Sequence, residues 1–135
     1  MVTSTVVYEG SLRVRNTHLK SEDTFLTDAP TDNNGKGEAF SPTDVVATAL
    51  ASCMLTIMGI LAEREHIDLV GTGANVTKTM ASNPRRISKI EVQFTFPKNY
   101  DDSTKKKLEN AALTCPVHHS LHPDIDKDIQ FIYPS

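Results

Sequence analysis

The chain has 135 residues, of which 39% are hydrophobic and 23% charged, and its formal net charge is −3 at pH 7. This length suits one domain with a hydrophobic core, so we predict a single domain over residues 1–135. Binding to a nucleic-acid backbone needs a basic surface, which 14 Lys and Arg against 17 Asp and Glu do not supply. The first residues lack a basic, apolar leader, so we expect a cytoplasmic protein whose cysteines stay reduced.

The first part of the chain is predicted to form a small antiparallel sheet followed by a loop. Residues 3–8 and 12–17 are β-rich, and residues 9–11 between them contain a glycine typical of a tight hairpin. Residues 24–27 are a third β-rich segment. Residues 28–38 contain proline, glycines, paired asparagines and several charges, which predict a loop.

A long apolar helix is predicted to follow and to end near Glu65. Ser41 fits the N-cap, Pro42 fits the first helical position, and Asp44 completes a capping box. Residues 45–62 carry no charge and are almost long enough to cross a bilayer. This segment contains polar and small residues, however, and charges of both signs follow it. A single such helix among strands favours the centre of a globular core, so we expect no membrane association.

The rest of the chain is predicted to add three strands and two helices. Strands are expected at residues 69–80, 87–96 and 128–133. Between the last two strands we expect a helix that is capped by Asp101 or Asp102 and ends near Leu113, and then a short helix that starts with Cys115 and Pro116. The order β-β-β-α-β-β-α-α-β is an α+β fold. Because the long helix is apolar on more faces than one small sheet can cover, we expect an obligate homodimer with these helices packed together.

Two cysteines are the candidate reactive groups, Cys53 in the long helix and Cys115 at the start of the short one. Their separation excludes a CxxC motif, and two are too few for a disulfide scaffold. Each could instead be a small buried apolar residue. Because a thiol attacks as the thiolate, and Pro116 makes Cys115 a helix cap where the dipole favours negative sulfur, the local sequence predicts Cys115 as the attacking thiol.

Histidines close to Cys115 raise the question of a metal site. His118 and His119 lie in the same short helix, and one of them should share a face with Cys115. Together with Cys53 they could bind zinc through thiolate and imidazole. The paired spacings of structural zinc sites are absent, so we expect neither a metal nor a cofactor. His18, at the end of the second predicted strand, is assigned no role.

Two motifs make the chain resemble a known family. Residues 41–46 (Ser-Pro-Thr-Asp-Val-Val) and 49–53 (Ala-Leu-Ala-Ser-Cys) resemble the central helix of the OsmC/Ohr superfamily, which includes organic hydroperoxide resistance proteins. Residues 115–117 (Cys-Pro-Val) match its second cysteine motif. The strand order and chain length fit as well, so the resemblance covers nearly the whole chain. It implies an OsmC-like fold in which antiparallel sheets wrap around long central helices in an intertwined homodimer.

The resemblance implies a thiol-dependent peroxidase for organic hydroperoxides. In this family the first cysteine attacks the O–O bond and becomes a sulfenic acid, which would be Cys53 here. The second, Cys115, would condense with it to a disulfide, and an external dithiol, lipoyl or similar, would reduce the pair. This assignment reverses the local prediction from the helix cap, and we follow the family.

The attacking thiol of this family is activated by an arginine from the N-terminal sheet. Arg13 and Arg15 lie on one face of the second predicted strand. Its position after the turn at Glu9 and Gly10 favours Arg13, with Arg15 as the alternative. The family's glutamate, which orients the arginine, is replaced here by Thr43, with Asp44 next in sequence. Asp44 either reaches the arginine or serves only the helix cap.

Two other functions use the same residues. A cleft between helix and sheet could serve a redox sensor or a small-molecule-binding protein without turnover. Cys115 and the neighbouring histidines could instead form a metal-binding module. Peroxide-dependent turnover with a dithiol reductant distinguishes the peroxidase from the sensor or binding protein and from the metal-binding module. Metal analysis identifies the metal-binding module.

Overall fold

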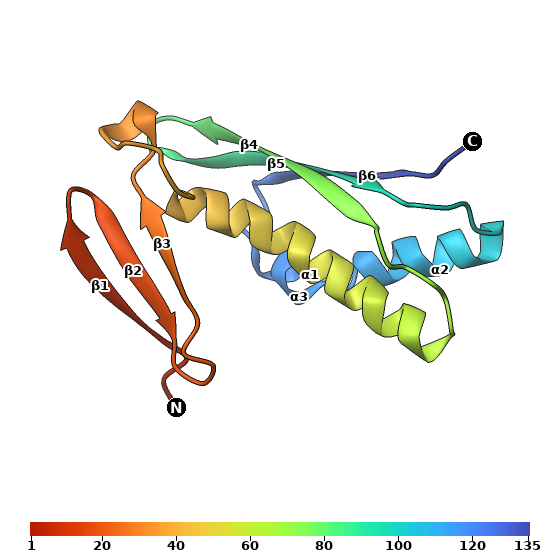
Figure 1. The fold of residues 1–135 in the computed structure, drawn as a ribbon. Helices are drawn as coiled ribbons and strands as arrows, with labels where there is room; N and C mark the ends of the chain where they lie inside the picture. Colours follow the sequence, from red (N-terminus) through yellow and green to blue (C-terminus); the bar gives the residue numbers. More distant parts are fainter. The chain divides into compact units, whose positions relative to one another are not determined.

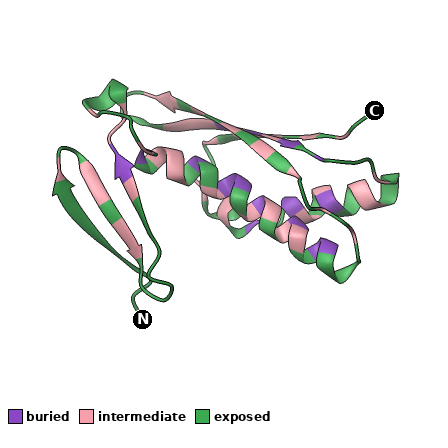
Figure 2. Cartoon of the chain, viewed as in Figure 1, coloured by how far each residue is buried: buried purple, intermediate pink, exposed green.

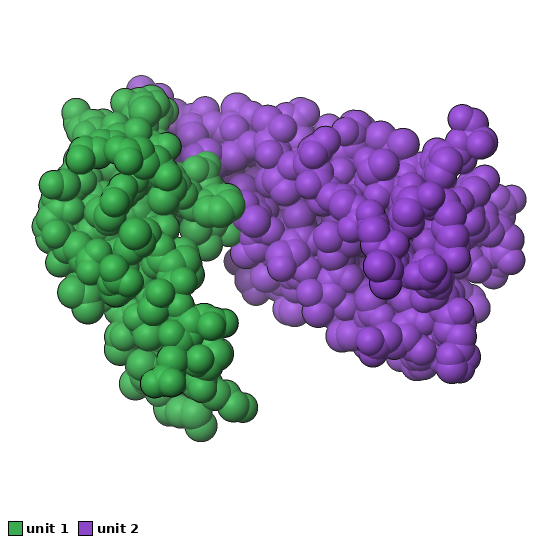
Figure 3. Space-filling model, in the orientation of Figure 1, with its two compact units in different colours: residues 1–46 green, residues 47–135 purple.

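The computed structural model describes residues 1–135 and divides them into two compact units, residues 1–46 and residues 47–135 (Figures 1 and 3). The first unit holds β1 (Ser4–Gly10), β2 (Arg13–His18), β3 (Thr24–Asp28), the short 3-10 helix η1 (Thr31–Asn33) and the start of α1 (Pro42–Arg64). The second holds the rest of α1, β4 (Gly73–Ala81), β5 (Arg86–Thr95), α2 (Asp102–Ala112), α3 (Pro116–Ser120) and β6 (Asp126–Ile132). The predicted element order and α+β class are confirmed. A single domain over the whole chain stays a prediction.

The first unit is a three-stranded antiparallel sheet in the order β1-β2-β3. The predicted hairpin turn is formed by Gly10, Ser11 and Leu12, whose φ angles of 89°, 54° and 62° are left-handed and match the twist of the flanking strands. β3 is longer than predicted, because Asp28 pairs with Arg13 in the β2–β3 ladder. Asp28 therefore belongs to the sheet and not to the loop.

α1 begins with the predicted capping box. The Asp44 N–H donates to Ser41 Oγ at 3.1 Å, and the Ser41 N–H donates to Asp44 Oδ2 at 3.0 Å. Pro42 is the first helical residue, where its missing N–H costs no hydrogen bond. The helix ends at Arg64, one residue before the predicted end.

The second unit is built on a three-stranded sheet in the order β4-β5-β6. β4 begins at Gly73 and not at Leu69, because the Thr72 N–H and hydroxyl both donate to the Leu69 carbonyl and close a turn. β4 and β5 are antiparallel, whereas β5 and β6 are parallel. The expectation of antiparallel sheets is therefore wrong for this pair. α2 and α3 connect β5 to β6, and a helical crossover of this kind returns the chain in the same direction.

One face of the second sheet carries the hydrophobic core. The part of α1 beyond residue 46 and α2 both pack on this face (Figures 1 and 2). The core contains Leu50, Met54 and Met58 from α1, Ile90, Val92 and Phe94 from β5, and Leu108 from α2. The alternation predicted for β5 is confirmed, because the residues between these buried ones are only partly buried.

α1 is the only helix long and apolar enough to cross a membrane, as judged by length and composition. Core helices of globular proteins meet the same criterion. Within this chain, 39% of its most apolar window is buried. Large apolar side chains such as Ile60, which is 56% exposed, remain uncovered by the chain itself.

Candidate active site

The second unit brings the two cysteines together. Cys53 lies in α1 and is half-buried, whereas Cys115 is fully buried directly before α3. A hydrogen bond joins the two side chains, and both thiols are free. Two residues far apart in the sequence are therefore in contact in the fold.

Cys115 caps α3, as the sequence predicted. Its Sγ accepts the His118 N–H at 3.4 Å, and Pro116 is the first helical residue. Burial nevertheless raises the pKa of the Cys115 thiol, and the hydrogen bond with Cys53 raises it further; the backbone N–H groups of the cap lower it by less. The local prediction of an activated Cys115 is therefore wrong.

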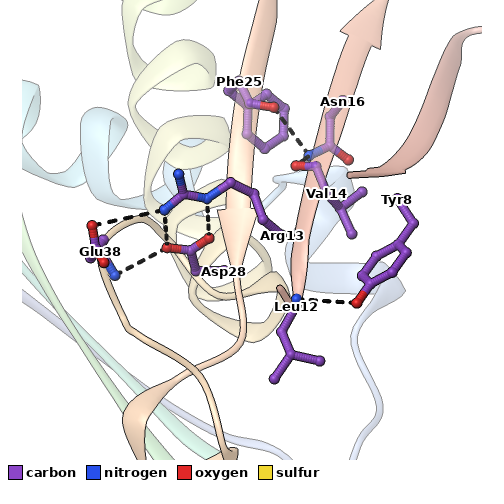
Figure 4. Close-up of polar contacts among 8 residues, drawn as sticks. All are labelled: Tyr8, Leu12, Arg13, Val14, Asn16, Phe25, Asp28 and Glu38. Atoms are coloured by element: carbon purple, nitrogen blue, oxygen red, sulfur yellow. Dashed lines mark hydrogen bonds and ion pairs between the residues drawn. The ribbon is translucent and has the colours of Figure 1, made fainter. Parts of the chain in front are cut away.

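Arg13 lies at the start of β2 in the first unit and is held by Asp28 (Figure 4). Its Nε donates to Asp28 Oδ1 at 2.7 Å, and its Nη2 donates to Asp28 Oδ2 at 2.8 Å. The Arg13 side chain is 35% exposed and that of Asp28 only 3%. The hydrogen bond between them is the largest cause of a lowered pKa at Asp28 and a raised pKa at Arg13. Both groups are therefore charged at neutral pH.

Arg15, the alternative arginine, has a different environment on the same strand. Its Nε donates to Glu9 Oε2 at 2.8 Å, and this is an exposed contact. A single hydrogen bond between exposed groups holds a side chain less firmly than a bidentate pair. Arg13 is thus the more rigidly placed of the two.

Thr43 and Asp44 stand where the resemblance places the family's glutamate. Asp44 forms the helix cap with Ser41, and the Thr43 hydroxyl lies 3.2 Å from Ser41 Oγ. Asp44 therefore takes part in the helix cap, and the carboxylate that pairs with Arg13 is that of Asp28. The sequence reasoning missed Asp28. The hairpin register would have identified it, because opposite charges facing each other across a ladder attract.

The histidines have neighbours of their own. The rings of His118 and His119 meet edge to face, with centroids 5.7 Å apart. Burial is the largest cause of the lowered pKa of His118, followed by the charge of Lys127, so this imidazole is uncharged at neutral pH. His18 Nδ1 lies 2.7 Å from Ser21 Oγ. No group of three or more His, Cys, Asp or Glu side chains is arranged to hold a metal ion.

Neither cysteine lines either of two polar pockets. One of about 260 Å³ in the first unit is lined by Glu9, Gly10, Ser11, Arg13 and Lys36. The other, of about 180 Å³, lies on the open face of the second sheet and is lined by polar side chains of β4, β5 and β6. Only the first contains a candidate site residue, Arg13.

Comparison with known proteins gives a consistent result. The family described as OsmC-like protein matches residues 35–130. A Psychrobacter arcticus 273-4 protein, described as an osmotic stress induced and detoxification response protein, is 55% identical, with a TM-score of 0.95 over 98% of this chain and 96% of that chain. No curated protein sequence matches this chain.

Two more distant structures share the fold. An organic hydroperoxide resistance protein of Legionella pneumophila has a TM-score of 0.74 at 13% identity, over 97% of each chain. One of Elizabethkingia anophelis, with thiocyanate bound, has a TM-score of 0.76 at 12% identity, over 99% of this chain and 98% of that chain.

Proposed function

Since this chain belongs to the OsmC/Ohr superfamily, we propose that it is a thiol-dependent peroxidase that reduces organic hydroperoxides. The observation that carries the proposal is the hydrogen-bonded contact between Cys53 and Cys115. Family membership supports a peroxide-related redox function, as do the organic hydroperoxide resistance proteins that share the fold. The finer assignment, a two-cysteine peroxidase with the properties of a peroxiredoxin, is our proposal.

The proposed reaction has three steps. The Cys53 thiolate attacks the O–O bond of ROOH, which gives the Cys53 sulfenic acid and, after protonation of the leaving alkoxide, ROH. The Cys115 thiol then attacks the sulfenic sulfur, and a disulfide and water form. An external dithiol, lipoyl or similar, reduces the disulfide by thiol–disulfide exchange and becomes oxidised itself. A raised pKa keeps Cys115 protonated during the first step, so it does not compete with Cys53 for the peroxide. In the second step Cys115 loses its proton as it attacks, and this proton leaves with the sulfenic hydroxyl as water.

Arg13 is proposed as the activating cation. A guanidinium near the sulfur favours the Cys53 thiolate and stabilises the negative charge that develops on the leaving oxygen. Its fixed positive charge supports this role. Arg15 is the alternative, and its single exposed contact with Glu9 makes it the weaker candidate.

A homodimer is the proposed assembly. The uncovered apolar surface of α1 supports a second copy as its cover, because water contact with such a surface is unfavourable by roughly 25 cal/mol per Å². We also propose a cytoplasmic location, where thiols are kept reduced. Neither nucleic acid nor membrane is a proposed partner.

Steady-state peroxide consumption tests the proposal. The protein is supplied with dithiothreitol or dihydrolipoamide, and tert-butyl or lipid hydroperoxide is compared with hydrogen peroxide. We expect faster consumption of the organic peroxides. If no peroxide is consumed faster than in the protein-free control, the enzyme hypothesis is wrong and a sensor or binding protein becomes the better interpretation.

A further inference from the structure

The guanidinium of Arg13 is fixed by one carboxylate on the neighbouring strand. Arg13 and Asp28 face each other in the β2–β3 ladder, and two parallel hydrogen bonds of 2.7 Å and 2.8 Å join them. Such a bidentate pair fixes the plane of the guanidinium as well as its position. The orientation of Arg13 is therefore set by Asp28.

Asp28 is itself held in place on several sides. Its side chain is 3% exposed, and its Oδ2 also accepts the Glu38 N–H at 3.2 Å. Its own N–H donates to the Phe40 carbonyl at 3.0 Å. A buried carboxylate with three hydrogen-bond donors has little freedom to rotate. Because Asp28 is fixed by β3 and the following loop, the Arg13 side chain that it binds is restricted as well.

The pair leaves one edge of the guanidinium available. Asp28 takes the Nε and Nη2 edge, and Glu38 Oε2 lies 4.0 Å from Nη2 (Figure 4). Nη1 makes no hydrogen bond and is not directed at either carboxylate (Figure 4). An arginine has five N–H donors, so this arrangement keeps both Nη1 hydrogens for an external acceptor.

We propose that Asp28 is the positioning residue of Arg13 and orients its Nη1 donors for the peroxidase reaction. The proposal rests on the proposed function, in which Arg13 supports the Cys53 thiolate and the leaving oxygen. Asp28 touches neither sulfur nor peroxide and acts through Arg13 alone. It takes the part of the family's glutamate, for which the sequence offers Asp44 as one alternative; Asp44 caps α1.

The kinetic test compares four single variants by the rate constant for oxidation of Cys53 by tert-butyl hydroperoxide. Asp28→Asn should slow this step on the order of tenfold or more, because small errors of orientation are costly in catalysis. Asp28→Glu, which keeps the carboxylate, should restore part of the loss. Asp44→Asn should slow the step less. Glu9→Gln, which breaks the comparable but exposed pair with Arg15, is the matched control and should leave the rate unchanged.

A double variant separates positioning from a general structural effect. In an Arg13→Ala background, Asp28→Asn should cause no further slowing of Cys53 oxidation, because Asp28 affects the reaction only through the Arg13 side chain, which this background lacks. Equal slowing by Asp28→Asn with and without Arg13 would overturn the proposal. So would a wild-type rate in Asp28→Asn.

A readout without peroxide keeps this proposal separate from the proposed function. In nitrogen-15 NMR of the wild type, the Arg13 Nε–H should exchange slowly with water, and in Asp28→Asn it should exchange fast. If the wild type consumes no peroxide, the proposed function fails, and the orientation of Arg13 by Asp28 is still decided by this signal. An unchanged Nε–H signal in Asp28→Asn would overturn the proposal whatever the kinetics.

Discussion

The two thiols differ in burial, and burial affects how readily a thiol forms the reactive thiolate. Cys115 is fully buried with a raised pKa, whereas Cys53 is half-buried. A helix cap alone would favour the Cys115 thiolate, but removal from water outweighs it. This difference supports the proposal that Cys115 is the resolving thiol and Cys53 the attacking one.

Serine variants test this order. Cys53→Ser should abolish peroxide turnover, because no thiolate remains to attack the O–O bond. Cys115→Ser should complete one rapid turnover and then accumulate a sulfenic acid, because a sulfenate without a resolving partner persists. Stopped-flow kinetics and intact-mass spectrometry measure both outcomes. A block of the first oxidation step in Cys115→Ser would show that Cys115 attacks.

The ion pair of Arg13 and Asp28 predicts a defined pH dependence. The pKa of Asp28 is lowered from 3.8, chiefly by its hydrogen bond to Arg13. A carboxyl with a lower pKa in the folded state stabilises that state above its unfolded pKa, and this contribution disappears as the pH falls through the folded value. The difference in unfolding free energy between wild type and Arg13→Ala should thus be constant at neutral pH and shrink below about pH 4. Urea unfolding as a function of pH measures it, and a difference that grows with acid would contradict it.

At the scale of elements, the Ser41 hydroxyl stabilises the first turn of α1. Ser41 is buried, and its Oγ accepts the Asp44 N–H. Ser41→Ala should lower the free energy of unfolding by about 1 kcal/mol, because the first turn loses a capping acceptor. Thr56→Ala, which removes an exposed hydroxyl from the middle of the same helix, is the control and should be nearly neutral. Urea unfolding compares the two, and an equal loss in both would argue against the cap.

α2 is joined to the core through Leu108, which is completely buried. Leu108→Ala should lower the free energy of unfolding by about 2–5 kcal/mol, because it leaves a cavity between α2 and the sheet. Leu113 directly follows α2 and is 45% exposed, so Leu113→Ala should cost far less. A small effect of Leu108→Ala in thermal unfolding would mean that α2 is not part of the cooperative core.

At the scale of the whole molecule, we predict a homodimer through α1. Sedimentation velocity at low micromolar concentration should give the mass of two chains. Ile60→Glu, which places a charge on the uncovered apolar surface of α1, should shift the distribution toward the monomer. Val70→Glu is the control, because Val70 is 86% exposed and lies outside α1. A wild-type monomer at this concentration would exclude the dimer.

The sequence by itself determined the element order and most element boundaries. The capping box at Ser41 and Asp44, the alternation in β5 and the tight hairpin turn after β1 all involve residues close together in the chain. Such signals act through local hydrogen bonds and side-chain periodicity, so they can be read without the fold. The two cysteine motifs identified the family in the same way, by short local patterns.

Only the tertiary structure decided the partners of the site residues. The pairing of Arg13 with Asp28, the contact of Cys53 with Cys115 and the parallel pairing of β5 with β6 each join segments that are separated along the chain. The direction of the Cys115 pKa also depended on the fold, because burial by distant segments outweighed the local helix cap. Capping and periodicity extend over a few residues, whereas burial and ion pairing depend on every segment that packs nearby.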